Sequence, residues 1–181
     1  MNQIAKFEKV SYEQFKKDFI DAFPDSDFSV TTEEGQVVEN IRYIYDHIKL
    51  PKRATTGSAG YDFFAPVWIG VKVDECKKIP TGIRCYIEDG WVLQLYPRSG
   101  HGFKYGVSLA NTVGIIDADY YSAKNEGHIH VKLLNDSSIG NDIHIDPNEA
   151  FCQGVFVPFG VTYDDDTDGV RVGGFGSTSN T

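Results

Sequence analysis

The sequence has few cysteines and no long apolar run, and both absences limit what the protein can be. Its three cysteines, Cys76, Cys85 and Cys152, show no CxxC spacing. Three cysteines cannot all pair within one chain, so a reducing compartment is favoured over a disulfide framework. No stretch approaches the roughly 20 apolar residues of a membrane span, and the start, MNQIAKFEKV, lacks the apolar core of a signal peptide. We therefore expect a soluble cytoplasmic protein without a membrane partner.

Positive charge is also scarce. The chain has 17 lysines and arginines against 26 aspartates and glutamates, a formal net charge of -9. This balance excludes a broad electrostatic grip on nucleic acid, so no nucleic-acid partner is expected. Any phosphate must be held locally, by a few well-placed cations or by a bridging divalent ion. Because phosphate oxygens are hard ligands, that ion is predicted to be Mg²⁺.

Two common catalytic motifs are missing as well. The sequence contains no GxxxxGK[ST] stretch, which excludes a P-loop nucleotidase. It contains no GxSxG elbow, and Ser99 near His101 is not a catalytic couple, because adjacency in sequence does not set up the hydrogen bond that a serine nucleophile needs.

The N-terminal part of the chain predicts one amphipathic helix. Residues 11 to 23, SYEQFKKDFIDAF, have the spacing of a capping box at Ser11 and Gln14, and Pro24 follows. One helical stripe would hold the apolar side chains Tyr12, Phe15, Phe19, Ile20 and Phe23. The stretch up to residue 40 is acidic and rich in turn residues, which indicates a loop or an exposed hairpin.

From residue 41 onward the pattern is typical of strands. Short runs rich in valine, isoleucine, tyrosine and phenylalanine alternate with turn residues about every 8 to 12 positions. Among them are WVLQLY, KYGVSLA, HIHVKLL and FCQGVFVPF. No second long helical pattern separates these runs, so a closed or sandwiched antiparallel architecture is favoured. The length of 181 residues suits one domain with appendages.

Three stretches carry residue types that suit phosphate and nucleotide chemistry. PRSG places Arg98 and Ser99 in a turn, where a guanidinium and a hydroxyl can meet a phosphate. Two strand-like runs flank a predicted hairpin turn at residues 111 to 114. Asp117 and Asp119 then stand two apart, and they are either a solvated strand end or a general base with its orienting partner. The final GGFGSTSNT is either a frayed end or a segment that wraps phosphate oxygens.

Taken together, the ordered stretches resemble the five motifs of the homotrimeric dUTPase family. They are GSAGYDFFAP (57 to 66), PRSG (97 to 100), ANTVGIIDADY (110 to 120), FCQGVFVP (151 to 158) and GGFGST (173 to 178). The resemblance covers roughly residues 41 to 181. It implies an all-β, jelly-roll-like β-barrel over residues 41 to 163, an N-terminal helical extension over 1 to 40, and a flexible glycine-rich tail over 164 to 181.

The resemblance also implies an activity. The family hydrolyses dUTP to dUMP and pyrophosphate by attack of water on the α-phosphorus, which keeps uracil out of DNA and supplies dUMP for thymidylate synthesis. Asp117 matches the base that activates the water. Tyr120 matches the ring that packs under the deoxyribose, and the turn that reads uracil corresponds to Asn111, Gly114 and Ile115. The family forms homotrimers with active sites at the subunit interfaces.

The remaining motifs imply the phosphate and metal contacts. Asp62 matches an acid that holds Mg²⁺ through water, the ion being bound mainly by substrate phosphates. In the tail, Phe175 would stack on uracil while the glycines let the segment close as a lid. The other implied substrate contacts, most of them to phosphates, are Arg98, Ser99, Gly100, Gln153, Arg171, Gly176, Ser177 and Thr178.

Three departures from the family pattern stand out. The tail arginine is one residue nearer to Phe175 than usual, since Val170 occupies the usual place and Arg171 follows. The stretch NEAF before Gln153 lacks the family's basic residue. The end of the third motif is lengthened by YSAKNEGHIHVKL. Its His128 and His130 would share one face of a strand; they could form half of a metal site, but no third ligand is evident nearby, so a strand surface or a subunit contact is favoured. Residues 164 to 169, DDDTDG, imitate a calcium loop but lack its closing glutamate.

Two other readings stay open at this stage. A dCTP deaminase, or a bifunctional deaminase and diphosphatase, shares the fold, although GIIDADY and GGFGST favour the hydrolase. A nucleotide-controlled regulatory protein would use residues 1 to 40 or the insertion after Tyr120 to dock a partner protein.

Overall fold

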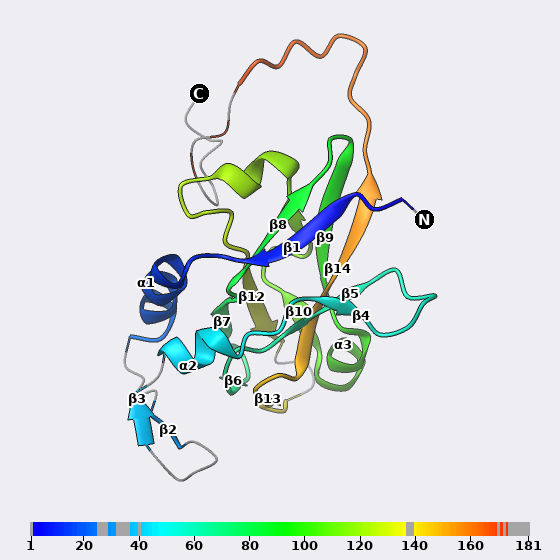
Figure 1. The fold of residues 1–181 in the computed structure, drawn as a ribbon. Coiled ribbons are helices and arrows are strands. Elements are labelled where there is room, and N and C mark those ends of the chain that lie inside the picture. Colours follow the sequence, from blue (N-terminus) through cyan, green and yellow to red (C-terminus); the bar gives the residue numbers. More distant parts are fainter. Residues whose placement is uncertain are drawn as a thin grey trace.

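The computed structural model of the chain describes residues 2–24, 29–31, 37–39, 41–136, 140–169, 171 and 173 (Figure 1). Its elements follow one another in the order β1 (Ala5–Lys9), α1 (Tyr12–Ala22), β2 (Ser29–Thr31), β3 (Val37–Glu39), α2 (Ile41–Asp46), β4 (Lys52–Arg53), β5 (Tyr61–Phe64), β6 (Ile69–Val71), β7 (Cys76–Pro80), β8 (Ile83–Ile87), β9 (Trp91–Pro97), α3 (Ser99–Tyr105), β10 (Val107–Leu109), β11 (Gly114–Ile116), the 3-10 helix η1 (Ala118–Ser122), β12 (His130–Asn135), β13 (Ile143–Ile145) and β14 (Ala150–Pro158).

The strands confirm the mostly-β class but not a closed barrel. The largest sheet has the order β11-β9-β14-β5-β4, and a second sheet has the order β10-β12-β7. Three pairs complete the described strands, β1-β8, β13-β6 and β2-β3; for the stretch before residue 40 a loop or a hairpin was expected, and the β2-β3 pairing fits the hairpin. Each of these pairings is antiparallel, and across the described residues the sheets do not join into one barrel.

Helix α1 forms where the sequence predicts it. The side chain of Ser11 caps the helix by accepting a hydrogen bond from the backbone N–H of Gln14 at 3.2 Å. Phe15 and Phe19 lie on the inner face and are completely buried. Ile20, expected on the same stripe, is instead 49% exposed.

The N-terminal segment is built into the β domain, so its description as an extension is not confirmed. Strand β1 pairs with β8 from Ala5↔Ile87 to Lys9↔Ile83. Phe15 belongs to the same core cluster as Phe63 and Phe151 of the large sheet. One hydrophobic core therefore spans the boundary expected at residue 41.

Two short helices replace expected strands or turns. Helix α2 forms at IRYIYD, where the β-branched and aromatic composition favours a strand; its inner residues are spaced as on a helix, with Ile44 buried and Ile41 and Tyr45 partly buried against the core. Helix α3 begins directly after Arg98, so PRSG is a strand end and a helix start rather than a turn. Gly106, in the left-handed conformation at φ 68°, ends α3 and leaves only Val107–Leu109 of the KYGVSLA run as a strand.

The cysteines and the helices relate to two expectations from the sequence, free thiols and the absence of a membrane span. Cys76 is exposed while Cys85 and Cys152 are buried, and all three are free thiols. In the part of the chain that the structure describes, none of the helices has both the length and the apolar character needed to cross a membrane.

Candidate active site

The third motif forms an arch between two sheets, made of β10, the turn at residues 110 to 113, and β11. Strands β10 and β11 flank the turn at residues 110 to 113, but β10 pairs with β12 whereas β11 pairs with β9. The expected hairpin is therefore wrong: the two strands diverge into different sheets. The turn is closed by the N–H of Thr112, which donates to Leu109 O at 2.9 Å, and Thr112 has a positive φ of 66°.

A pocket of about 430 Å³ opens beside this arch. Two residues predicted to read uracil, Asn111 and Gly114, line it. A Cβ atom at Gly114 would approach Leu95 Cβ to 3.0 Å, so the strands pack closely there only because position 114 is glycine. Ile115 lies on the other face of β11 with 49% exposure, so it can face the pocket only through its backbone. The other lining residues are Lys78, Leu95, Leu109, Ala110, Ile116, His130, Val131 and Lys132.

The proposed base lies directly after β11 and is paired with the tail arginine. Arg171 Nη2 is 2.5 Å from Asp117 Oδ2, and Arg171 Nε is 2.8 Å from Asp119 Oδ1. Both carboxylates are about half exposed, whereas the arginine side chain is only 15% exposed. The shifted arginine thus reaches both predicted active-site acids.

Tyr120 is anchored through its hydroxyl. Its Oη donates to the backbone O of His128 at 2.8 Å and accepts from Asn125 Nδ2 at 2.7 Å. The residue is 3% exposed, and burial raises the pKa of its phenol. Arg171 Cζ lies 5.7 Å from the ring centroid, so the ring lies beside the two acids and the tail.

The predicted phosphate and metal residues form a second group, around the middle strand of the large sheet. Gln153 on β14 is opposite Asp62 on β5, and its Nε2 donates to Pro97 O at 3.1 Å. Arg98 Nε is 3.2 Å from Asp62 Oδ1. Ser99 and Gly100 follow in the exposed first turn of α3.

The two groups lie at opposite ends of β9. Ile116, just before Asp117, is opposite Leu93 near the start of that strand, whereas Arg98 follows its last residue, Pro97. Leu93 and Arg98 are five positions apart along the strand, or roughly 17 Å at ~3.4 Å per residue. In Figure 1, α3 lies beyond one end of β9 and β14, and the C-terminal segment leaves β14 at the other end.

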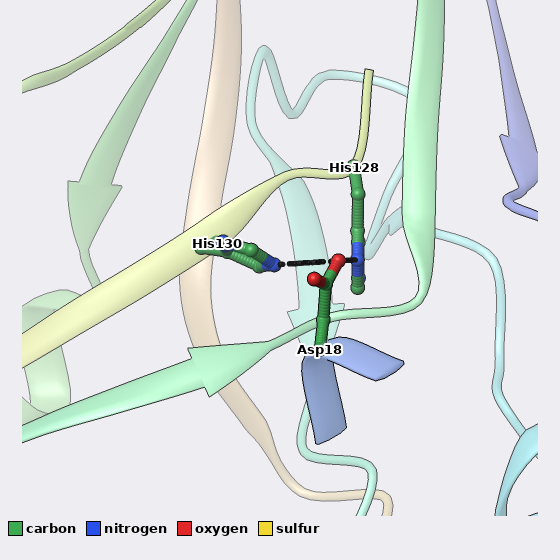
Figure 2. Close-up of side chains that lie close together, drawn as sticks. All are labelled: Asp18, His128 and His130. Atoms are coloured by element: carbon green, nitrogen blue, oxygen red, sulfur yellow. Dashed lines mark hydrogen bonds and ion pairs between the residues drawn. The ribbon is translucent and has the colours of Figure 1, made fainter. Parts of the chain in front are cut away.

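A third cluster was not found from the sequence. His128 Nδ1 lies 2.5 Å from Asp18 Oδ2, and His130 Nε2 lies 3.3 Å from the same oxygen (Figure 2). Asp18 is the third ligand-type residue missing from the HIHVKL pattern, and together the three side chains have the residue types of a metal site. The only sign of this cluster in the sequence was the position of Asp18 next to the buried stripe of α1. Its partners, His128 and His130, lie 110 and 112 residues further along the chain.

The charges in this cluster follow from burial and hydrogen bonding. Burial lowers the pKa of His128 to about 4, although Asp18 opposes this shift. Burial alone would raise the pKa of Asp18, but hydrogen bonds from His128, His130 and Gln14 hold it well below its ordinary value. At neutral pH, Asp18 is therefore a carboxylate and His128 is neutral.

The tail residues Phe175, Gly176, Ser177 and Thr178 lie outside the described residues.

Comparisons with known proteins point to one family. A model of the dUTPase family matches residues 46–179. Deoxyuridine 5'-triphosphate nucleotidohydrolase of Lactococcus lactis is 42% identical over 134 residues, which cover 72% of this chain and 88% of the relative. The crystal structure of dUTPase from Streptococcus mutans has a TM-score of 0.56 and 37% identity, covering 62% of this chain and 88% of that one. A mutant dUTPase of phage phi11 of S. aureus, described with a structural Mg(II) ion, has a TM-score of 0.54 and 21% identity, covering 67% and 90%.

Proposed function

The chain belongs to the dUTPase family and hydrolyses dUTP to dUMP and pyrophosphate, and from this premise we propose how its residues divide the reaction. The matched segment, 46–179, contains all five motif stretches. The deaminase alternative is not favoured, because the similar curated proteins are nucleotidohydrolases.

Asp117 is the general base. Its carboxylate is half exposed and directly follows β11, so it lies close to the arch and to Tyr120. When Arg171 turns to the γ-phosphate, Asp117 is released to orient a water molecule and take its proton. The water oxygen forms a bond to the α-phosphorus while the bond from that phosphorus to the bridging oxygen of pyrophosphate breaks.

The arch and Tyr120 supply specificity. Uracil offers an N3–H donor and an O4 acceptor, and cytosine offers the reverse. Backbone groups of the arch arranged for uracil would be left unpaired by cytosine, at about 1 to 3 kcal/mol each. The buried ring of Tyr120 leaves no room for a 2'-hydroxyl, which would exclude UTP.

Asp62, Arg98 and Gln153 serve the phosphates and the metal. Mg²⁺ prefers oxygen ligands and is usually bound by one or two carboxylates together with substrate phosphates. The single carboxylate of Asp62 suits this mode of Mg²⁺ binding. The guanidinium of Arg98, which is paired with Asp62, would bind the phosphate chain beside the ion. When bound, Mg²⁺ supplies positive charge that the acidic chain lacks and polarises the phosphoryl oxygens.

The active site is shared between subunits of a homotrimer. The observation that supports this proposal is the separation of Asp117 and Arg98 at opposite ends of β9. A neighbouring chain can bring its Arg98 group to the Asp117 group. Beyond β14, Phe159, Val161 and Tyr163 are exposed, and these apolar side chains suit a segment that lies against a second copy of the chain.

A complementation experiment tests the shared site. Arg98→Ala and Asp117→Asn are each expected to be nearly inactive, but trimers assembled from a mixture of the two contain some sites with both native residues. Pyrophosphate release from the mixture should therefore recover to a sizeable fraction of the wild-type rate. No recovery, despite mass-spectrometric proof of mixed trimers, would overturn the shared site.

The matched control combines two changes within one group. Arg98→Ala mixed with Gln153→Ala should not recover activity, because one chain supplies both residues to the same site. Recovery in this control would show that Arg98 and Gln153 serve different sites.

Two further expectations remain predictions. One is a cytoplasmic location. The other is a regulatory protein partner that docks on residues 1–40 or on the insertion after Tyr120.

A further inference from the structure

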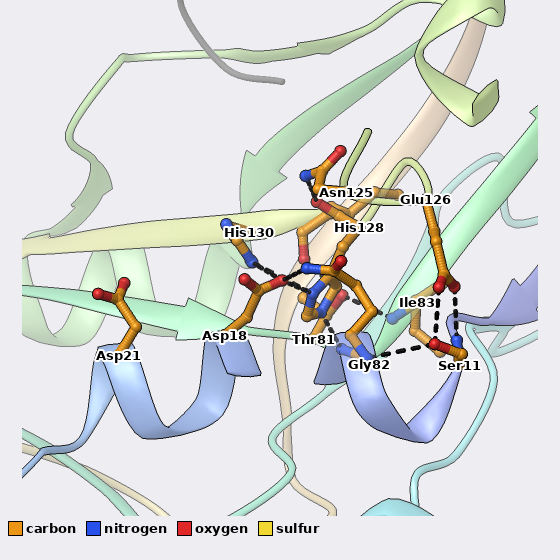
Figure 3. A network of polar contacts seen from close by, with 12 residues as sticks. Ser11, Asp18, Asp21, Thr81, Gly82, Ile83, Asn125, Glu126, His128 and His130 are labelled. Carbon is orange, nitrogen blue, oxygen red and sulfur yellow. Dashed lines mark hydrogen bonds and ion pairs between the residues drawn. The ribbon is translucent and has the colours of Figure 1, made fainter. Parts of the chain in front are cut away.

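Two segments that depart from the family pattern contact each other. Residues 1–45 lie outside the matched segment, and residues 121–133 lengthen the end of the third motif. Figure 3 shows two of the contacts between them, those of Ser11 and Asp18. The contacts are Tyr121 Oη to Glu8 Oε2 at 2.6 Å, Ser11 N and Oγ to Glu126 at 2.7 and 2.6 Å, and His128 Nδ1 to Asp18 Oδ2 at 2.5 Å.

His128 is held at both ring nitrogens. The backbone N–H of Gly82 donates to His128 Nε2 at 2.8 Å, so that nitrogen carries no proton. In the neutral ring the proton is then on Nδ1, which donates it to Asp18 Oδ2. Asp18 lies on α1, so this hydrogen bond ties the fully buried side chain of His128 to that helix.

The position of His128 fixes Tyr120 in turn. The backbone O of His128 accepts the hydrogen bond from Tyr120 Oη at 2.8 Å. Gly127, with φ +69°, brings the loop so close that a Cβ atom there would lie 2.7 Å from Tyr120 O. The loop therefore touches Tyr120 at both its backbone and its hydroxyl.

We infer that Asp18 is a positioning residue for the dUTPase reaction, acting through His128 to hold the ring of Tyr120 where it excludes a 2'-hydroxyl. The inference rests on the proposed role of Tyr120. Asp18 lies outside the segment that matches the family model, whereas Tyr120 lies in the third motif inside it. His130 lies 3.3 Å from the same Asp18 Oδ2 and also lines the pocket beside the arch.

A metal centre is the competing use of these three side chains. A metal ion between them would need the lone pair of His128 Nδ1, but that nitrogen carries the ring proton because Nε2 accepts from Gly82. Zinc titration followed by isothermal calorimetry should therefore give no binding that Asp18→Ala abolishes. Stoichiometric zinc binding that depends on Asp18 would overturn the positioning role of Asp18.

Discrimination between dUTP and UTP is the decisive readout. We expect Asp18→Ala to reduce the ratio of kcat/KM for dUTP to that for UTP about tenfold or more, because small misplacements of a positioned group have large kinetic effects. The matched control is Asp21→Ala. It removes the 2.7 Å ion pair of Asp21 with Lys78, one turn further along α1, without touching His128.

The outcomes separate the inference from the function on which it rests. Wild-type enzyme that hydrolyses UTP as well as dUTP would overturn the role of Tyr120. A wild-type preference for dUTP that Asp18→Ala and Asp21→Ala leave unchanged, or reduce equally, would overturn the role of Asp18 alone.

Two more variants keep the test valid if Asp18→Ala fails to fold. Asp18→Asn preserves the shape and an oxygen acceptor for His128 Nδ1–H, so it should retain most of the discrimination. Tyr120→Phe keeps the ring but removes the hydroxyl that donates to His128 O, so it should lower the discrimination. Discrimination left unchanged by Tyr120→Phe would contradict the inference.

Discussion

Arg171 pairs with Asp117 at 2.5 Å, which brings the tail guanidinium directly onto the proposed catalytic base. The same arginine holds Asp119 at 2.8 Å. A guanidinium that neutralises two carboxylates must leave them before it can bind phosphate, so under the proposed mechanism the substrate competes with these two acids for Arg171. The one-residue shift from Val170 to Arg171 still leaves the tail cation within reach of the active site.

Replacing Arg171 should weaken binding of the triphosphate specifically. Charge-assisted hydrogen bonds contribute about 1.5 to 3 kcal/mol, so Arg171→Ala should raise the KM for dUTP roughly 10- to 100-fold. Inhibition by dUMP, which has no γ-phosphate, should change little. A faster enzyme with unchanged KM would show instead that the Arg171 contact inhibits the site.

Replacing Asp117 should separate binding from chemistry. Asp117→Asn keeps the shape of the side chain but cannot take a proton from water. The expected result is a loss of about 10² to 10⁴ in kcat. Calorimetry with an α,β-imido analogue of dUTP should show binding close to that of the wild type. Retention of more than a tenth of kcat would remove Asp117 from the role of base.

Gly114 should be intolerant of any side chain. In Gly114→Ala the new methyl would lie 3.0 Å from Leu95 Cβ, and overpacking of this kind costs typically about 1 to 3 kcal/mol. We expect a lower urea midpoint and a higher KM for dUTP, because Gly114 lines the pocket. Gly57→Ala is the control, since a Cβ there meets no atom within 4 Å. Equal behaviour of the two variants would contradict the packing argument.

Acid should destabilise the fold through His128. Its pKa of about 4 in the folded chain is below the ordinary 6.5, so the unfolded chain takes up a proton first as the pH falls. The contribution of His128 to the free energy of unfolding is therefore fully present above pH 6.5. It is lost between about pH 6.5 and pH 4, by on the order of 3 kcal/mol. Urea unfolding at several pH values measures this loss. His128→Asn should flatten the profile in that window, whereas substitution of the exposed His144 by glutamine should not.

Local patterns predicted the elements whose signals are short-range. The cap of α1 by Ser11 and the strands at WVLQLY and FCQGVFVP depend on neighbouring residues, and the structure contains them. Composition misassigned α2, where isoleucine and tyrosine are spaced as on a helix. It also missed α3, because SGHGFKY has two glycines and a weak intrinsic tendency to form a helix.

Long-range contacts could not be read from the sequence. No local pattern shows that β10 and β11 belong to different sheets, or that Asp18 meets His128 across 110 residues. The five motifs assign the chemistry to particular residues, and that assignment stays a prediction; they did not show that Asp117 and Arg98 lie at opposite ends of β9. That separation depends on strand register, which tertiary packing decides.

Pyrophosphate release from dUTP, dCTP, dTTP and UTP, each with and without Mg²⁺ and with ammonia assayed in parallel, tests the central claim most directly. The account predicts release from dUTP alone, dependent on Mg²⁺, with no ammonia from any substrate. Ammonia from dCTP, or equal release from all four nucleotides, would contradict it.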